Sequence, residues 1–326
     1  TYNSAPYIYL AIRRGPMAQP TSGTQVYNAL SYTGTGATKD QNVGFPADLA
    51  FIRRSSDAGS QVAFDRLRGS TNYVTTTSTG AEEAFAGRTA SFSDGMNIVR
   101  LGSDALINGS AYTHINWFFR RYPGVFDEVC YTGTGIAHTE THNLGAVPEL
   151  MIVKNRNAAN HWYVYTAPTG NQQSLILSGT FALQPVDIGN WNYTTPTASV
   201  FSVGTNTVVN ASASTYVAYL FATKAGISKV GSYTGNGTNQ TINAGFSAGA
   251  RFVLIKRTDS TGDWFVWDST RGIVAADDPH LSLNTTVAEV TNDDSIDPDN
   301  SGFIVNQLAA TNVNVSSATY IFLAFA

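Results

Sequence analysis

The sequence predicts an all-β protein of three tandem β-sandwich or barrel-like domains, preceded by the last strand of an earlier unit. The first observation is a motif, Ser/Cys-Tyr-Thr-Gly-x-Gly, that begins at Ser31, Cys130 and Ser232 and so recurs about every 100 residues. The second is the pattern between these motifs, where short β-branched and aromatic runs alternate with Gly, Asn, Asp and Pro. No helical periodicity persists over the length of a helix. Units of this size can hold their own cores, unlike the short repeats of a solenoid.

The internal alignment divides the chain into four segments. Residues 1–25 form a terminal strand plus a Pro/Gly linker, residues 26–126 the first β repeat, 127–228 the second and 229–326 the third. Residues 5–14 (APYIYLAIRR) resemble the closing strand of each later unit. We therefore expect the chain to open on a strand whose partner lies in a preceding domain or a neighbouring subunit, because an unpaired aromatic edge strand favours aggregation.

The strands follow the same order in each repeat. They are expected at residues 25–33, 49–54, 62–67, 96–101 and 112–120, then at 150–154, 161–165, 197–203 and 216–223, and finally at 251–256, 264–268, 302–308 and 320–326. Turns are expected at 33–36, at 44–48 and at the Ser-Asp-Gly of 93–95.

Composition excludes several classes of protein. Charged residues make up only 13% of the chain and the net charge is −4, so no basic surface suited to nucleic acid is expected. Cys130 is the one cysteine, which rules out an intrachain disulfide, and we interpret it as a small strand residue. No apolar run approaches the ~20 residues of a membrane-spanning helix, so no membrane insertion is expected.

Four segments carry a resemblance to a known family: PYIYLAIRRGPM (6–17), RRYPGVFDEVCYTGTG (120–135), SKVGSYTGNGTNQTI (228–242) and ARFVLIKRTDSTGDWFVWDSTRG (250–272). They resemble a repeat family of tailed-bacteriophage virion proteins, described as tail-fibre-like or as a domain of unknown function. The third repeat matches the family pattern at Lys256, Asp268, Arg271, Gly272, Asn284, Thr286, Ala288, Glu289, Gly302, Phe303 and Tyr320, and the first at Asp65, Arg68, Gly69, Ala81 and Glu82. The second keeps Thr166 and Gly170 but lacks the Asp and the Arg.

Two features of the third repeat are candidate glycan contacts. Asp268 and Arg271 form an Asp-x-x-Arg-Gly motif, in which a charge-assisted hydrogen bond would close a turn. This structural role is the favoured interpretation, and contact of Arg271 with an acidic sugar is the alternative. Trp264 and Trp267 lie on opposite faces of one strand. Packing in a core or an interface is favoured for them, and stacking on a sugar is the alternative.

Two other clusters are weak candidates for a metal site. His138, Glu140 and His142 would share one face of a strand, which also suits a solvated polar surface. Asp297 and Asp299 resemble the start of a calcium loop, but Leu308 occupies the position of the bidentate Glu. The favoured prediction is therefore that no metal is bound.

No catalytic or cofactor-binding motif is recognisable, so we expect no enzyme activity and no cofactor. The resemblance implies a structural protein of the phage virion, in a tail fibre or appendage, whose repeats act as spacers with the distal one contacting a host surface glycan. By the same resemblance the partners are other virion proteins and the assembly is a homotrimer. A capsid decoration (head fibre) or tail accessory protein is the alternative, and a glycan-degrading tailspike is less favoured.

Overall fold

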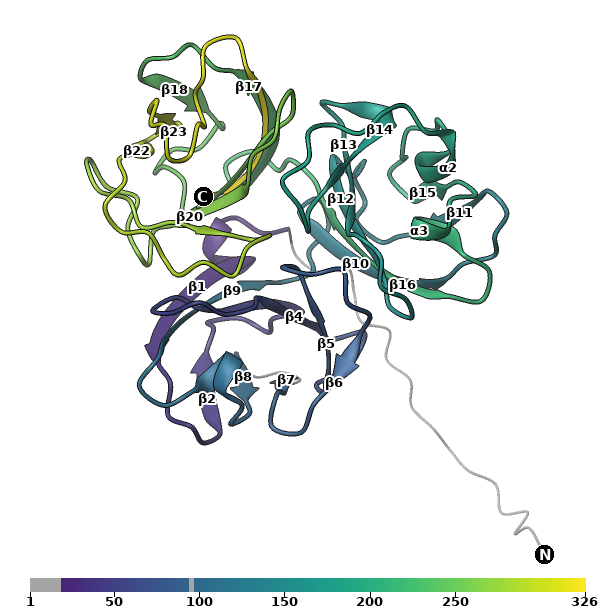
Figure 1. Ribbon diagram of the computed structural model, residues 1–326, viewed down its shortest axis with the longest axis horizontal. Helices are drawn as coiled ribbons and strands as arrows, with labels where there is room; N and C mark the ends of the chain where they lie inside the picture. Colours follow the sequence, from purple (N-terminus) through teal and green to yellow (C-terminus); the bar gives the residue numbers. More distant parts are fainter. Residues whose placement is uncertain (1–18, 94–96) are drawn as a thin grey trace, which may run out of the picture.

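The computed structural model describes residues 19–93 and 97–326, which form three β repeats side by side around a common centre (Figure 1). Each repeat has a large antiparallel sheet and a smaller one, so the predicted all-β class is confirmed and each repeat is a sandwich of two open sheets. The strand predicted at 5–14, the first part of the linker (15–18) and residues 94–95 of the predicted hairpin lie outside the described residues.

The large sheets share one strand order. In repeat 1 the order is β1 (Tyr27–Thr33), β9 (Thr113–Phe119), β3 (Leu49–Arg54), β4 (Val62–Asp65), β5 (Asn72–Thr75) and β6 (Glu83–Ala84). In repeat 2 it is β10 (Phe126–Thr132), β16 (Thr215–Phe221), β12 (Leu150–Asn155), β13 (Tyr163–Thr166) and β14 (Gly170–Ile176). In repeat 3 it is β17 (Ser228–Thr234), β24 (Thr319–Phe325), β19 (Phe252–Arg257), β20 (Trp264–Asp268) and β21 (Leu281–Ser282).

The small sheets and the helices complete each repeat. The small sheets are β2 (Lys39–Asn42), β8 (Ile98–Leu101) and β7 (Ala90–Phe92) in repeat 1, β11 (His138–Thr141) and β15 (Val200–Val203) in repeat 2, and β18 (Gln240–Asn243), β23 (Gly302–Val305) and β22 (Ile296–Asp299) in repeat 3. The helices are η1 (Gly23–Gln25), α1 (Ala105–Asn108), α2 (Ile188–Trp191) and α3 (Thr207–Asn210).

The Tyr-Thr-Gly-x-Gly motifs fasten each repeat's first strand to the loop before its last strand. The tyrosine hydroxyls of Tyr32, Tyr131 and Tyr233 donate to the carbonyl oxygens of Ile107, Val209 and Val313. An asparagine side chain then accepts a hydrogen bond from a backbone N–H of the turn, in the pairs Asn108–Thr35, Asn210–Thr134 and Asn314–Asn236. The last glycine of each motif, Gly36, Gly135 or Gly237, has a φ of 68°, 75° or 78°, a region that favours glycine.

Both faces of each large sheet are buried. On β3, Leu49 and Phe51 face a core shared by all three repeats, while Ala50 and Ile52 face the core of repeat 1 alone. The period of two along a strand therefore sorts successive side chains into two different cores. This arrangement explains why the central strands are nearly continuous apolar runs.

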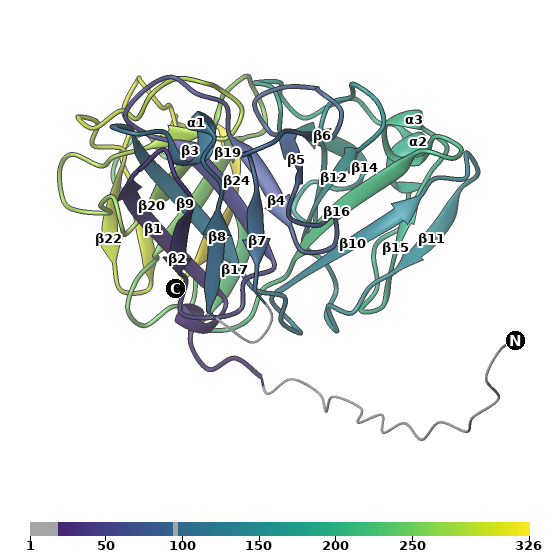
Figure 2. The same ribbon diagram turned by 90° about the horizontal axis from the view of Figure 1, so that it is seen from below.

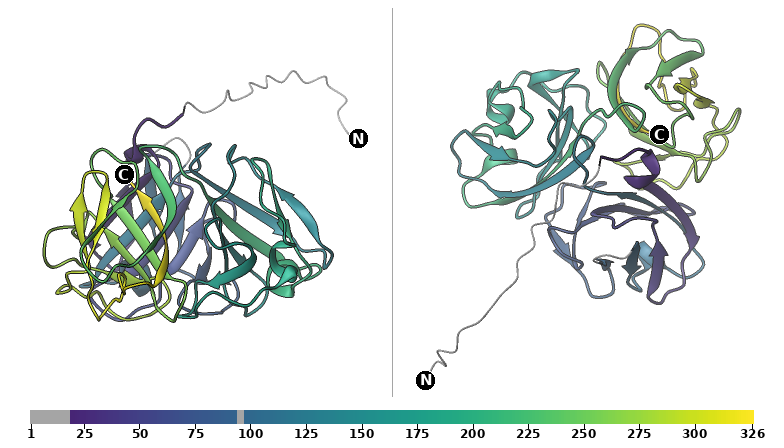
Figure 3. Two further views of the ribbon diagram at one scale, coloured as in Figure 1. Left: turned by 90° about the horizontal axis from the view of Figure 1, so that it is seen from above. Right: turned by 180° about the vertical axis from the view of Figure 1, so that it is seen from behind.

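The shared core unites the repeats around an approximate threefold axis (Figure 3). The closing strands β9, β16 and β24 end in Phe119, Phe221 and Phe325, whose rings touch one another with centroids 5.4–6.3 Å apart. Each repeat also has a core of its own, as the sequence predicted, but the shared core was not anticipated. The repeats are consequently one compact body rather than separate beads.

The two ends of the described chain meet at one end of this body. A Cβ atom on Gly23 would lie 1.8 Å from the carbonyl oxygen of Ala326, so only glycine allows this close approach. The strand β24 runs towards this end, and α1, α2 and α3 lie at the opposite end (Figure 2). Loops of all three repeats are therefore presented on the side away from the chain ends.

Candidate functional site

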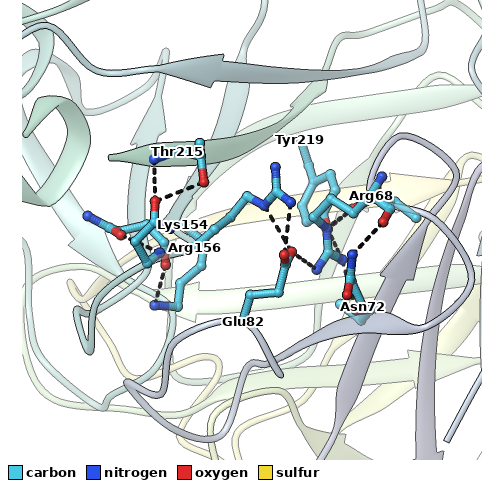
Figure 4. Close-up of polar contacts among 11 residues, drawn as sticks. Arg68, Asn72, Glu82, Lys154, Arg156, Thr215 and Tyr219 are labelled. Carbon is cyan, nitrogen blue, oxygen red and sulfur yellow. Dashed lines mark hydrogen bonds and ion pairs between the residues drawn. The ribbon is translucent and has the colours of Figure 1, made fainter. Parts of the chain in front are cut away.

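Buried networks of charged and polar side chains lie at the junctions between repeats. At the junction of repeats 1 and 2, the Arg68 guanidinium forms a salt bridge with Asp65. It also lies 3.1 Å from Glu82 (Figure 4). The Asp65 carboxylate also accepts the backbone N–H of Arg68 at 2.8 Å and the hydroxyl of Tyr219 at 2.7 Å. The side chains of Asp65 and Arg68 are fully buried. We call Asp65, Arg68 and Glu82 the first clamp.

This clamp binds repeat 1 to repeat 2. Arg156 of repeat 2 donates from Nε and Nη2 to Glu82 at 2.9 and 2.8 Å (Figure 4). Burial acts to lower the pKa of Arg68, but the neighbouring Tyr219, Asp65 and Glu82 reverse this effect and raise it. The guanidinium is therefore charged at every ordinary pH, and its charge is matched by carboxylates within the junction.

An equivalent clamp occupies the junction of repeats 3 and 1. Arg271 pairs with Asp268 at 2.6 Å and with Glu289 at 3.0 Å, and its side chain is 4% exposed. Here the indole N–H of Trp117, from repeat 1, donates to Asp268 at 2.9 Å. Trp117 and Tyr219 occupy the same position in β9 and β16, so in each clamp the aspartate accepts a hydrogen bond from this position of the next repeat.

The junction of repeats 2 and 3 lacks the clamp. The equivalents of Asp, Arg and Glu are Thr166, Thr169 and Leu183, and the two threonine hydroxyls share a hydrogen bond of 2.8 Å. The position of Trp117 and Tyr219 is occupied in β24 by Leu323. The Asp, the Arg and the Glu of the clamp are thus all replaced by uncharged residues at this junction.

A buried cation near the end of the third large-sheet strand crosses each junction. Lys154 lies 2.8–3.3 Å from four carbonyl oxygens, those of Thr79, Asn155, Ala158 and Asn160. Lys256 donates to Thr180 of repeat 2 at 3.2 Å and to Gly262 at 2.8 Å. Arg53 donates to carbonyl oxygens of repeat 3, including those of Thr285 and Val287. Burial lowers the pKa of Lys154 and of Lys256 to about 8 and that of Arg53 to about 10.

One acidic side chain at the first junction has no partner. Glu128 is 1% exposed, and neither carboxylate oxygen has a hydrogen bond. Its position in β10 corresponds to Ala29 and Val230 in the other repeats. Burial, reinforced by the charges of Asp65 and Asp48, raises the pKa of Glu128 well above its ordinary value.

The three candidate glycan contacts lie in the interior. Trp264 and Trp267 are fully buried, and the Arg271 side chain is almost so. Trp264 donates its indole N–H to Ile176 of repeat 2 at 2.8 Å, whereas Trp267 packs in repeat 3's own core against His280. A sugar could stack on either ring only if the core opened.

The four candidate metal ligands do not converge. The Nε2 atom of His138 contacts Glu140 at 2.8 Å, while Nε2 of His142 contacts the carbonyl oxygen of Thr197 at 3.1 Å. In the β22–β23 hairpin, Asp297 accepts from Asn306 at 2.9 Å and Asp299 accepts the Ser301 hydroxyl at 2.6 Å. Among residues 19–93 and 97–326, no group of three His, Cys, Asp or Glu side chains is placed to hold a metal ion.

Sequence reasoning singled out Asp268 and Arg271 but missed the junction partners Trp117, Tyr219 and Arg156. The available signal was the alignment of the repeats with one another, in which Asp, Arg and Glu are kept or lost as a set. That pattern indicates a cooperating group, but not which repeat supplies the remaining members.

Comparison with known proteins assigns the chain to one family. No helix in the described part of the chain is long and apolar enough to cross a membrane. No curated protein matches the sequence. One family model, described as "Domain of unknown function (DUF7483)", matches residues 22–326 and so spans all three repeats and every junction. The chain therefore belongs to the DUF7483 family.

Proposed function

We propose that this chain is a structural protein of a bacteriophage virion, in a tail fibre or related appendage that contacts the host surface. The observation that carries the proposal is the arrangement of the ends: the described chain starts and finishes together at one end, and loops of three repeats occupy the other. Such a body can be attached at one end and present loops at the other. The sequence resemblance to virion proteins supports the same assignment.

The proposed task of the repeats differs from a series of spacers. Because the repeats lie side by side around a shared core, they add width rather than reach. All three then contribute loops to one contact surface. Several weak contacts made together from this surface, or from several copies on one particle, would gain strength through avidity.

The same compactness favours a second candidate, a capsid decoration or tail accessory protein. Labelling phage particles with antibodies against the purified chain separates the two: label at the tail supports the appendage, and label over the capsid lattice overturns it.

Binding of the purified chain to host cells, but not to cells stripped of surface polysaccharide, supports the host-contact role. Analytical ultracentrifugation of the purified chain tests the homotrimer that the sequence resemblance implies.

We also propose that the chain binds rather than cleaves. The carboxylates of the two clamps, Asp65, Glu82, Asp268 and Glu289, are all engaged by arginines at the junctions. Incubation with host surface polysaccharide should leave its chain length unchanged. Shortened chains in this assay would assign the protein to the tailspike class instead.

A further inference from the structure

Repeat 3 contains a small hollow at the end of the molecule away from the chain ends. It has a volume of about 140 Å³ and lies between the loop after β19 and the loop before β24. Arg257, at the edge of the hollow, lies opposite Tyr320 in the antiparallel pairing of β19 with β24. Tyr320 is near the start of β24, the strand that runs to the C-terminal end. The hollow therefore opens on the side that the proposed function assigns to host contact.

A longer loop shapes this hollow. Between the last strand of the small sheet and the asparagine that bonds the first turn, repeats 1 and 2 have a short path that includes α1 or α3 (Leu101 to Asn108 and Val203 to Asn210). In repeat 3 the path from Val305 to Asn314 is two residues longer and contains no helix. The longer loop supplies one wall of the hollow, through Thr311 and Asn312.

The wall is held in place before any ligand arrives. Asn312 has a φ of 52°, and its side chain donates to the carbonyl oxygen of Ala309 at 2.8 Å while accepting from Gln307 at 3.2 Å. The Asn312 carbonyl oxygen also accepts the hydroxyl of Tyr320 at 2.7 Å. A preformed wall lowers the ordering cost of binding.

The lining combines an apolar floor with a polar rim. Ile255, Phe265 and Val313 form the floor and are buried. At the rim, Arg257 is tied through two contacts of 3.0 Å to Asp259, and Asp263 accepts from Asn284 at 2.7 Å. Arg257 is matched by the Asp259 carboxylate, and one oxygen of Asp263 is already engaged by the Asn284 amide, so the hollow suits a neutral ligand with hydroxyl groups.

We propose that this hollow is a binding site for a single neutral sugar ring, such as the terminal residue of a surface glycan. A pyranose has an apolar C–H face for the floor and hydroxyl groups for the amide, hydroxyl and carboxylate rim. The volume is well below the ~300 Å³ at which drug-sized sites begin, so one ring rather than a longer saccharide enters it. The site specifies the ligand class of the host contact proposed above and rests on that function.

Blocking the mouth tests the site. Ala310→Trp places a large ring at the exposed rim, and Ala309→Trp adds the same ring at an exposed neighbour outside the lining. Saturation-transfer NMR with glucose, galactose, mannose and N-acetylglucosamine should give a signal with the parent chain, from affinity on the order of 1 mM. The signal should disappear in Ala310→Trp and persist in Ala309→Trp.

The controls separate this site from the proposed function. If Ala310→Trp does not fold, as judged by its melting curve, Thr261→Trp blocks the opposite rim. Absence of signal for every sugar, or equal signal in parent and blocked variants, overturns the site. In either case, host-cell binding that continues unchanged leaves the proposed function standing, whereas sugar binding without cell binding overturns the function alone.

Discussion

The junction of repeats 1 and 2 and the junction of repeats 2 and 3 solve the same packing problem with opposite chemistry. The first buries Asp65, Arg68 and Tyr219 in a charged network, and the second has Thr166, Thr169 and Leu323 at those positions. The backbone frame, meaning the main-chain hydrogen bonds across the junction, is the same in both. The backbone N–H groups of Glu82 and Leu183 each donate to a carbonyl oxygen at a strand end of the next repeat, at 2.8 Å in both cases. This frame therefore forms without the charged residues. The charged residues, in contrast, depend on one another.

The largest expected effect comes from breaking the charged junction at one member. Arg68→Ala leaves Asp65 buried without its cation, a situation that costs about 3–5 kcal/mol in the free energy of unfolding. Thr169→Val, at the equivalent position of the other junction, removes a neutral hydroxyl that bonds only to Thr166, and should cost about 1 kcal/mol. Urea titration of both variants checks the difference. Equal losses would show that the two junctions are energetically alike.

The buried cations give the next largest effect. Lys154→Met strips four carbonyl oxygens of their donor and should cost about 1–3 kcal/mol. Lys154→Arg should be tolerated much better, because Arg53 occupies the equivalent position in repeat 1. Thermal melting of the pair provides the measurement. If the Met variant is as stable as the Arg variant, the Lys154 ammonium group adds nothing to stability, and only the aliphatic part of the side chain contributes.

The buried Glu128 gives the first junction a carboxyl group that titrates, whereas the junction of repeats 2 and 3 has Val230 at this position. The raised pKa of Glu128 means that the folded protein holds this proton more tightly than the unfolded chain does. Its contribution to stability is thus complete below the unfolded value of about 4.3 and is lost as the pH rises through the folded value. The facing charges are Asp65, Asp48, Arg121 and Arg68.

Comparison of the parent chain with Glu128→Gln isolates this effect. The amide keeps the shape but cannot ionise, so the variant should gain stability relative to the parent as the pH rises between the unfolded and the folded pKa of Glu128. The gain should be about 1.4 kcal/mol for each step of one pH unit in that window. Unfolding free energies measured from pH 4 upward provide the test. Parallel stability curves for the two proteins would contradict a buried carboxyl group with a raised pKa.

Much of the fold was accessible from the sequence because the central strands carry a strong signal. The strands at 49–54 and 264–268 were predicted to the residue, since runs buried on both faces are continuously apolar. The small-sheet strands β2 and β18 were missed because their sequences, KDQN and QTIN, are largely polar. Helices of four residues are too short to show a periodicity.

The site was less accessible for a different reason. Asp65 and Tyr219 are 154 positions apart, and nothing in either residue identifies the other as its partner. Alternation along β20 correctly placed Trp264 and Trp267 on opposite faces, but it could not show that both faces are buried. Burial of the second face depends on a neighbouring repeat, which is a property of the assembled ring rather than of one strand.

The smallest expected effect belongs to a full exchange of the junction chemistry. Giving the first junction the residues of the second requires Asp65→Thr, Arg68→Thr, Glu82→Leu, Arg156→Thr and Tyr219→Leu together. Replacing a whole buried ionic set with neutral and apolar groups is often neutral or stabilising, so the combined variant should unfold within about 1.5 kcal/mol of the parent. Urea titration beside Arg68→Ala makes the comparison direct. A combined loss as large as that of Arg68→Ala would show that this junction, unlike its neighbour, has a frame that depends on its charges.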